Sequence, residues 1–525
     1  MPKLVIDNRE VEVDKGATIL DAAEKLGIEI PTMCFLKGCK ASTSCMLCVV
    51  KVDGLGSLMP ACGAIAEDGM QVQSNSEEVR QTRKAALELL LSDHLGDCMG
   101  PCQVACPARM NIPLMIRQIA AGKFRDAIVT VKKDIALPAV LGWICPAPCE
   151  RVCRRAMFDE TVSICLLKRF VADFDLQSEN PYLPICKPPQ DKHVAIVGAG
   201  PAGLAAAYYL QQDGFSCTIF DEHEKPGGML RYAVSQKQLL SDVLDKEIAL
   251  IEKLGAKFHG QTRIGTNLSM VDLRRDFDAV FMATGVLKPG DAECQGLETG
   301  PNGIAINNDT YETNLPGVFA GGDAVCRRRL TVRAVADGKE VAVSINQYLS
   351  GQRVIGATKP FNTHIGKLND NEIERFMAGV NKTPRVKPSK KDYGFTNEQA
   401  IEEATRCMHC DCRKAESCKL RQYAGQYQAR PNRYKGERRL FVQELKHPDI
   451  VYEPGKCIDC GLCIQIASDS GERLGLTFIG RGFDVRVAVP FDRSIADALK
   501  HTAKRCVEVC PTGALAFKDK VLASK

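Results

Sequence analysis

The alternation of hydrophobic and polar positions predicts a small β-sheet unit at the start of the chain. The segment "LVIDNREVEV" alternates apolar and polar residues and predicts two short strands around a turn at Asn8-Arg9. The segment "GATILDAAEKLGI" has the apolar spacing of a helix and ends at Gly27. Residues 1–79 are therefore expected to form a β-grasp-like unit.

The patterns further along predict four more regions. Residues 80–190 carry a 3.6-residue period in "TRKAALELLLSDHLGDC" and "IPLMIRQIAAGKFRDAIVTVKKD", so helices are expected before the proline-rich boundary "ENPYLPICKPPQD". Residues 191–355 alternate strand and helix patterns, which is typical of a doubly wound α/β unit. Residues 356–439 are expected to be a polar linker with a cysteine group, and residues 440–525 a small cysteine-bearing module. The expected fold class is multidomain α/β and α+β.

Composition limits the class of protein but does not identify a function. The chain has 525 residues, 45% hydrophobic and 25% charged, as in an ordinary globular protein. It lacks an apolar run of about 18 residues and a signal-peptide start, so we expect no membrane span and a cytoplasmic location. The formal net charge of +5 is weak for this length and argues against a nucleic acid partner. The basic stretches "CRRRLTVR" and "RPNRYKGERR" are either solvated surface or a docking patch for an acidic partner such as ferredoxin.

Cysteine is the strongest compositional signal, with 25 residues in the chain. A disulfide framework is a poor explanation in a large chain without an export signal. The cysteines also cluster at C-x2-C and C-x3-C spacing, which suits thiolates that share one inorganic centre. We therefore expect metal centres in a reducing compartment.

The first cysteine site has the spacing Cys34-x10-Cys45-x2-Cys48-x13-Cys62, with Cys39 as an extra cysteine. Its segments "PTMCF", "SCMLCVVKV" and "MPACGA" resemble the [2Fe–2S] domain of the large iron–sulfur subunit of respiratory complex I and of related hydrogenases and formate dehydrogenases. The resemblance implies a [2Fe–2S] cluster held by the four spaced thiolates. Structural zinc is the alternative, but it commonly uses two tight cysteine pairs.

A second cysteine region comprises "HLGDCMGPCQVACPARMNIPLMIRQ" and "GWICPAPCERVCRRAMFDETVSICLLKRF". It resembles the N-terminal domain of the glutamate synthase small subunit and of dihydropyrimidine dehydrogenase, where two [4Fe–4S] clusters take crossed ligands from two segments. The resemblance implies one set of Cys98, Cys102 and Cys153, and a second set of Cys106, Cys145 and Cys149.

The fourth ligands of these two sets depart from the family pattern. His94 stands where the family has an earlier cysteine, and complex I's large subunit also begins a ligand set with His-x3-Cys. His94 is thus a candidate ligand for the first set, and a surface histidine is the alternative. Lys168 occupies the Gln or Glu position of the second set, but Cys165 is the better candidate because lysine must lose a proton to bind.

The third cysteine site lies in "ATRCMHCDCRKAESCKL" and comprises Cys407, Cys410, Cys412 and Cys418. Four thiolates fit one [4Fe–4S] cluster, and zinc is the alternative. Four further cysteines, Cys186, Cys217, Cys294 and Cys326, have no motif partners and are expected to be buried thiols.

The fourth cysteine site lies in "GKCIDCGLCIQIA" and "KRCVEVCPTGAL", where one complete ligand set remains, namely Cys457, Cys460, Cys463 and Cys510. These segments resemble half of a two-cluster bacterial ferredoxin. The resemblance implies one [4Fe–4S] cluster in a ferredoxin-like domain, with Cys506 as a spare packing cysteine.

A nucleotide site follows in "HVAIVGAGPAGLAAAYYL", where Gly198, Gly200 and Gly203 stand between an apolar strand and a helix. Such glycines let a pyrophosphate approach the helix N-terminus, and Asp221 in "CTIFDE" is placed to bind a ribose. With "KPGGMLRY", "FMATG" and "GVFAGGDAV", the order resembles the FAD domain of the glutamate synthase small-subunit family. The implied FAD-binding residues are Gly198, Gly200, Pro201, Gly203, Asp221, Gly227, Gly228, Met229, Arg231, Thr284, Gly285, Gly322, Asp323, Thr331 and Val332, with Gly322 and Asp323 at the ribityl–phosphate part and Thr331 and Val332 by the flavin ring.

That family inserts an NADPH-binding unit, on the order of 100 residues, after its "ATG" segment. Here the sequence between Gly285 and Gly303 is short and has no second glycine-rich turn. We therefore expect that a nicotinamide bound in the usual place does not reduce this flavin.

Together these resemblances indicate the electron-wiring subunit of an anaerobic oxidoreductase complex, with FAD, [2Fe–2S] and three or four [4Fe–4S] clusters. The expected partners are a hydrogenase or formate dehydrogenase catalytic subunit and an FMN-bearing, NADH-oxidising subunit, with electron bifurcation as one form of the arrangement. No catalytic residue of its own is assigned. The alternatives are a free-standing NAD(P)H-dependent reductase and a zinc-and-iron scaffold with a vestigial flavin fold.

Overall fold

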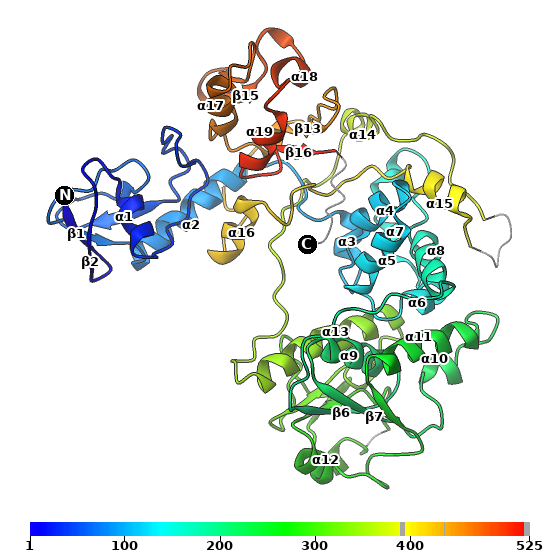
Figure 1. Ribbon diagram of the computed structural model, residues 1–525. Helices are drawn as coiled ribbons and strands as arrows, with labels where there is room; N and C mark the ends of the chain where they lie inside the picture. Colours follow the sequence, from blue (N-terminus) through cyan, green and yellow to red (C-terminus); the bar gives the residue numbers. More distant parts are fainter. Residues whose placement is uncertain (289, 389–393, 435, 519–525) are drawn as a thin grey trace. The chain divides into compact units, whose positions relative to one another are not determined.

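The structure is a computed structural model that describes residues 1–288, 290–388, 394–434 and 436–518. The chain forms two compact units that are interleaved along the sequence (Figure 1). Unit 1 comprises residues 1–100, 360–380 and 408–525, and unit 2 comprises residues 101–359 and 381–407. The chain thus leaves unit 1 and returns to it, so sequence neighbours near these borders belong to different cores.

Unit 1 begins with a mixed sheet in the order β2-β1-β5-β3-β4. Strands β1 and β5 run parallel, while β1–β2, β3–β5 and β3–β4 are antiparallel. The strands are β1 (Lys3–Ile6), β2 (Arg9–Glu12), β3 (Val49–Val52), β4 (Met59–Pro60) and β5 (Gln71–Gln73). Helix α1 (Ile19–Lys25), which Thr18 caps, contributes Ile19, Ala22 and Ala23 to the buried core of this sheet.

The first hairpin turn lies one residue earlier than the alternation predicts. It is formed by Asp7 and Asn8, whose φ angles are 48° and 63°, and not by Asn8-Arg9. A two-residue turn between twisted strands needs positive φ at both positions, and Asp and Asn tolerate that conformation better than Arg.

The rest of unit 1 contains short helices and two antiparallel ladders, β13–β16 and β14–β15. Helix α2 ends at Ser92, so His94 and Cys98 lie in the loop beyond it and not within the predicted helix. The elements are α2 (Glu77–Ser92), α14 (Asp370–Phe376), α16 (Lys419–Gln426), β13 (Ile450–Tyr452), η4 (Pro454–Lys456), α17 (Leu462–Asp469), β14 (Thr477–Ile479), η5 (Gly482–Asp484), β15 (Arg486–Ala488), η6 (Pro490–Asp492), α18 (Ile495–Ala498), α19 (Ala503–Val509) and β16 (Leu515–Phe517).

Unit 2 begins with a helical layer. The periodic segment that begins at Ile112 forms two helices, α4 and α5, because the chain turns at Gly122 with a φ of +69°. The elements are α3 (Pro101–Ala105), α4 (Ile112–Ala120), α5 (Phe124–Lys132), α6 (Pro138–Ile144), α7 (Pro148–Arg151), η1 (Arg154–Met157) and α8 (Ile164–Leu176), and α15 (Asn397–Ala404) packs against α4 and α8.

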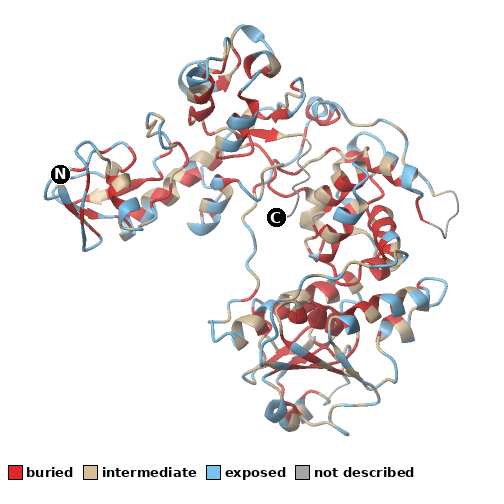
Figure 2. Cartoon of the chain, in the orientation of Figure 1, coloured by how far each residue is buried: buried red, intermediate tan, exposed pale blue. Residues whose placement is uncertain are grey.

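The second half of unit 2 is a parallel sheet in the order β12-β9-β6-β7-β8, the doubly wound arrangement that the sequence predicts. Helices α9 and α13 pack together beside the sheet (Figure 1), and both present buried faces (Figure 2). The elements are β6 (His193–Val197), α9 (Pro201–Gln212), β7 (Ser216–Phe220), α10 (Met229–Tyr232), α11 (Ser241–Lys253), β8 (Lys257–His259), α12 (Met270–Asp276), β9 (Ala279–Met282), η2 (Glu293–Gln295), β10 (Thr299–Gly300), β11 (Gly303–Ile304), β12 (Val318–Ala320), η3 (Gly322–Ala324) and α13 (Thr331–Leu349).

None of the helices in the described ranges is long and apolar enough to cross a membrane. The stretch 356–439, expected to be a linker with a cysteine group, contains the helices α14, α15 and α16. One prediction about the isolated cysteines is wrong. Of the four cysteines expected to be buried, only Cys217 is, whereas Cys294 is exposed and Cys186 and Cys326 are half-buried.

Candidate cluster and flavin sites

The four thiols of the first site converge in unit 1. Cys45 and Cys48 lie in the loop before β3, Cys62 follows β4, and all four side chains, Cys34 included, are buried. The Sγ atoms of Cys48 and Cys62 are 3.2 Å apart, and the N–H of Cys45 donates to the Sγ of Cys34 over 3.5 Å. The arrangement is the one that a shared inorganic centre requires.

The pKa values of these thiols show that the group cannot carry four negative charges unaided. Hydrogen bonding to Cys45 lowers the pKa of Cys34 to about 2, and hydrogen bonding to Cys62 lowers that of Cys48. Hydrogen bonding to Cys34, together with burial, raises the pKa values of Cys45 and Cys62. Bound cations remove this conflict, because metal coordination deprotonates thiols outright. The residues therefore fit an iron–sulfur cluster.

In unit 2, the second set of the helical region surrounds one cavity. Its wall includes Cys106, Cys145, Cys149 and Cys165, together with Lys168 and Val332. The hydrogen bond with Cys165 lowers the pKa of Cys145 to about 6. The structure thus brings all four expected thiols of this set together, and their role as ligands is our prediction.

Lys168 is buried beside this cavity. Its Nζ donates to the carbonyl oxygen of Leu141 over 3.1 Å. Burial lowers the pKa of the ammonium, but the surrounding thiolates, Cys165 and Cys145 foremost, outweigh it, so the pKa is raised. Lys168 is therefore a retained positive charge beside the cluster site, and Cys165 is the more suitable ligand.

The structure does not keep the other set of this region within one unit. Cys102, in α3, and Cys153, before η1, belong to unit 2, whereas His94 and Cys98 belong to unit 1. Within unit 1, the Sγ of Cys98 is 3.3 Å from the Oγ1 of Thr363. The backbone N–H of Cys412 donates to the carbonyl oxygen of Cys98 over 3.3 Å.

The third site is also divided between the units. Cys407 packs against the core of unit 2, as do Cys102 and Cys153. Cys410, Cys412 and Cys418 lie in unit 1. Burial, followed by the thiolates of Cys412 and Cys98, raises the pKa of Cys418 to about 12.

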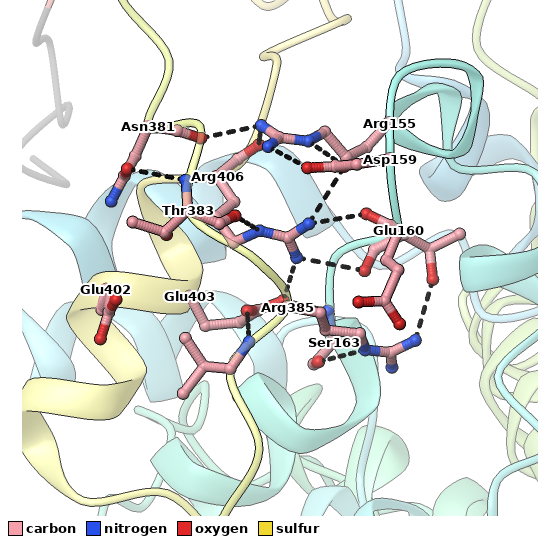
Figure 3. A network of polar contacts seen from close by, with 12 residues as sticks. Arg155, Asp159, Glu160, Ser163, Asn381, Thr383, Arg385, Glu402, Glu403 and Arg406 are labelled. Atoms are coloured by element: carbon pink, nitrogen blue, oxygen red, sulfur yellow. Dashed lines mark hydrogen bonds and ion pairs between the residues drawn. The ribbon is translucent and has the colours of Figure 1, made fainter.

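A buried polar network fixes the segment that leads into Cys407 (Figure 3). The guanidinium of Arg406 donates to Asp159 over 3.1 Å and to Glu403 over 3.0 Å. Arg155 donates to the carbonyl oxygens of Arg406 and Asn381 over 3.0 and 2.9 Å. The loop that follows Cys153 and the segment before Cys407 are thereby held together inside unit 2.

The four expected ligands of the fourth site line a single cavity in unit 1. Cys457 follows η4, Cys460 and Cys463 flank the start of α17, and Cys510 caps the C-terminus of α19. Cys506 is fully buried outside this wall, as the spare-cysteine prediction implies.

These unit 1 sites share one packed core. Cys34 and Cys45 of the first site, Cys460 of the fourth and Cys418 belong to a single cluster of buried residues that also contains Met33, Leu47, Ile458 and Leu462. Packed apolar side chains, and not solvent, therefore lie between the thiol sites of unit 1.

The imidazole of His94 is placed to act as a metal ligand. Its Nδ1 is buried and has no hydrogen-bond partner. Burial, followed by the nearby Lys456, lowers the pKa of the imidazole to about 4, so the ring is neutral, the form that binds metal. Sequence reasoning missed Lys456, and a lysine one residue before a cysteine gives no signal of burial on its own.

The glycine turn after β6 has the shape of a dinucleotide cradle. Gly198 has a φ of +112°, and a Cβ there would lie 2.3 Å from the carbonyl oxygen of Ala283. A Cβ on Gly203 would lie 2.0 Å from the carbonyl oxygen of Gly198, while Gly200 faces open space. The turn lies between β6 and β9, where strand order reverses, which is where such sheets bind nucleotides. The chain can therefore accept the pyrophosphate of FAD.

Other predicted flavin residues surround this turn. Gly228 packs on the cradle, since a Cβ there would be 2.8 Å from the Cα of Gly200. Thr284, after β9, has a buried Oγ1 without a partner. Asp323 accepts from the N–H groups of Arg328 and Arg329, and Gly322 donates to Asp337.

The remaining predicted flavin residues lie on nearby elements: Pro201 begins α9, Met229 and Arg231 belong to α10 after Gly227, Gly285 follows β9, and Thr331 and Val332 begin α13.

Asp221 has a structural task in addition to the expected ribose contact. Its Oδ2 accepts the N–H of Ala199 over 2.7 Å, and its Oδ1 accepts the N–H of His223 over 2.9 Å. The carboxylate thus holds the glycine turn in place before any nucleotide binds.

Four known domain families match the chain. A 2Fe-2S iron–sulfur cluster binding domain matches residues 3–77, and the 4Fe-4S cluster domain II of dihydropyrimidine dehydrogenase matches residues 74–180. An NAD(P)-binding Rossmann-like domain matches residues 196–255, and a pyridine nucleotide-disulphide oxidoreductase domain matches residues 261–338.

Curated relatives are subunits of redox enzymes. The NADPH-Fe(3+) oxidoreductase subunit beta of Geobacter sulfurreducens is 37% identical over 247 residues, which are 46% of this chain and 34% of that protein. The NADP(+)-dependent formate dehydrogenase subunit beta of Moorella thermoacetica is 37% identical over 239 residues, 42% of this chain and 32% of that protein. The glutamate synthase [NADPH] small chain of Bacillus subtilis is 34% identical over 215 residues, 39% of this chain and 43% of that protein. The chain thus spans less than half the length of these relatives.

These matches confirm the resemblances on which the sequence analysis depends. Segments of the chain match 2Fe-2S and 4Fe-4S cluster-binding domains and an FAD-type domain of the pyridine nucleotide-disulphide oxidoreductase class.

Proposed function

We propose that this chain is the electron-transfer subunit of a multi-subunit oxidoreductase. In this role it carries electrons between a hydrogenase or formate dehydrogenase catalytic subunit and an FMN-bearing, NADH-oxidising subunit, with bifurcation at the FAD as one form. Iron–sulfur clusters pass single electrons, and FAD exchanges one or two.

The connection between β9 and β12 carries the proposal. In the described residues 283–288 and 290–317, the regular structure is limited to the turn η2 and the two-residue strands β10 and β11. A nicotinamide-binding unit needs a sheet and helices of its own, on the order of 100 residues. Hydride transfer requires the nicotinamide at about 3–3.5 Å from the flavin. The short β10–β11 ladder supplies no residues to hold a nicotinamide there. In this proposal the iron–sulfur clusters therefore deliver the electrons to the flavin.

Two further observations support a wiring role. In unit 2, Val332 lines the cavity of Cys106, Cys145 and Cys149, and the family resemblance puts the same residue by the flavin ring. In unit 1, the first and fourth sites share one buried core with Cys418. Each arrangement favours short electron steps between neighbouring centres.

A free-standing NAD(P)H-dependent reductase is the second candidate. The Geobacter sulfurreducens relative bears the name of an NADPH-Fe(3+) oxidoreductase subunit, and a Rossmann-like match covers residues 196–255. This candidate requires the nicotinamide to bind without an inserted unit, so the two proposals differ in a measurable rate.

The test uses the isolated chain, purified anaerobically with its cofactors. Rapid mixing with NADPH or NADH, followed at the flavin absorption band, should give little reduction. Mixing with a low-potential one-electron donor such as titanium(III) citrate should bleach the cluster bands and then the flavin band. Fast bleaching of the flavin by NADPH or NADH would establish the free-standing reductase and refute the wiring proposal. A flavin that the one-electron donor leaves oxidised would also refute it.

A further inference from the structure

We propose that one [4Fe–4S] cluster lies wholly within unit 1, with ligands from two segments that are far apart in the sequence. The four ligands are His94, Cys98, Cys412 and Cys418. This set differs from both sequence-based sets, because it takes Cys98 from the helical region and Cys412 and Cys418 from the third site.

The backbone brings the two segments together. The N–H of Cys412 donates to the carbonyl oxygen of Cys98 over 3.3 Å, a contact between loops and not between regular elements. Cys98, Cys412 and Cys418 are 7%, 8% and 5% exposed, so the three thiols are buried in the same unit. Buried thiols that face one another need a cation or a shared proton.

Two glycines make room for this meeting. A Cβ on Gly513 would lie 2.3 Å from the Sγ of Cys412 and 3.6 Å from the Cδ of Lys456. A Cβ on Gly96, between the His94 and Cys98 positions, would lie 2.6 Å from the Cε of the same lysine. Both segments therefore pack around one buried lysine stem, whose ammonium bonds to Glu453 over 2.6 Å.

His94 supplies the fourth position. It stands four residues before Cys98, beyond the end of α2, and its buried Nδ1 has no hydrogen-bond partner. A buried ring nitrogen without a partner costs stability unless it binds something. Imidazole nitrogen is an established cluster ligand in place of thiolate.

The chain path gives this cluster a structural role. The chain enters unit 2 after residue 100 and finally returns at residue 408, so the proposed ligands stand on either side of the inserted segment. A cross-link that closes a long loop removes conformational entropy from the unfolded chain. The cluster would therefore also stabilise unit 1.

The same division gives Cys407 a different partner set. Cys407 packs against the unit 2 core alongside Cys102 and Cys153, and the Arg406 network fixes its approach to the loop after Cys153. We therefore assign Cys407 to the cluster of Cys102 and Cys153.

The experiment compares iron loss in single and double serine variants of the full chain, purified anaerobically. Cys98→Ser and Cys412→Ser should each lose one cluster, about four iron ions, and the double variant should lose no more. Cys407→Ser should lose a different cluster, so its loss should add to that of Cys412→Ser. Additive losses for Cys98 and Cys412, or shared loss for Cys407 and Cys412, would refute the proposal.

Controls separate ligation from misfolding. Cys506→Ala removes a fully buried unit 1 thiol outside the ligand set and should keep all iron. The [2Fe–2S] EPR signal of the first site, which also lies in unit 1, should stay at the wild-type level in the serine variants. If a serine variant fails this check, Cys98→Asp and Cys412→Asp keep an anionic ligand and should shift the EPR signal of the same cluster. Shifts in signals of two different clusters would refute the assignment.

Discussion

Removal of the Arg406 guanidinium should destabilise unit 2 far more than the loss of an exposed arginine. Arg406 has a fully buried side chain that donates to the carbonyl oxygens of Thr383, Thr161 and Glu160 over 2.9, 3.3 and 2.8 Å. It also donates to the carboxylates of Asp159 and Glu403 over 3.1 and 3.0 Å. Arg406→Met keeps apolar volume but leaves these acceptors without their donor.

The size of the loss follows from what remains. Glu403 is fully buried and keeps only the backbone N–H groups of Ser163 and Val386, at 2.7 and 2.8 Å, among its recorded donors apart from Arg406. Removing one partner of such a buried pair costs about 3–5 kcal/mol, because the other charge stays buried. For a unit of this size, the unfolding midpoint should fall on the order of 10 °C.

The matched control is Arg275→Ala in the same unit. Arg275 also pairs with two carboxylates, Asp276 at 2.8 Å and Asp272 at 3.1 Å, but its side chain is 66% exposed. Exposed pairs contribute about 0–1 kcal/mol. A double variant, Arg406→Met with Glu403→Gln, should lose less than the sum of the two single losses, since the stranded charge is gone.

The assay follows thermal or urea unfolding through the fluorescence of Trp143, the single tryptophan of the chain, which lies in α6 of unit 2. Arg169 stacks over its ring at 3.5 Å, so unfolding changes its environment. If Arg406→Met shifts the midpoint no more than Arg275→Ala, the buried network is dispensable and the reasoning is wrong.

Four further outcomes are expected. Cys45→Ser should remove the [2Fe–2S] EPR signal and leave the [4Fe–4S] signals, and an unchanged signal would refute the ligand set of the first site. His94→Cys should lower the reduction potential of one [4Fe–4S] cluster in an EPR redox titration, because thiolate adds negative charge; unchanged potentials would rule out His94 as a ligand. Lys168→Met should keep the iron but lower the potential of the Cys106 cluster, on the order of 100 mV, whereas iron loss would identify Lys168 as a ligand. Burial raises the pKa of Glu247 to about 7, so the folded state binds the Glu247 proton more tightly than the unfolded state does. The free energy of unfolding should therefore fall by up to about 3 kcal/mol as the pH rises from about 4.5 to 7. Urea unfolding at pH 5 and pH 8 should show a weaker pH dependence in Glu247→Gln, and an equal pH dependence in both proteins would contradict the assignment.

The sequence by itself determined the features that depend on neighbouring residues. The glycine turn after β6 could be predicted because Gly198 has a φ of +112°, which glycine adopts readily, and a Cβ on Gly203 would lie 2.0 Å from the carbonyl oxygen of Gly198. The spacings of the first and fourth sites place all their thiols on loops and helix ends of one unit, and there the expected residues do meet. Spacing decides which loop holds a ligand because a short loop reaches only its own neighbourhood.

Only the tertiary structure decided which distant segments meet. Cys98 and Cys102 are four residues apart, yet they belong to different units, and Cys412 contacts Cys98 from the far end of the inserted segment. The hydrogen bond by which Asp221 holds the glycine turn could not be predicted either, because its donor, Ala199, lies 22 residues away in the sequence. The reason is physical: the stability of each unit comes from the burial of its own apolar residues, and the position of a border between two cores is a property of the whole packing and not of the residues beside it.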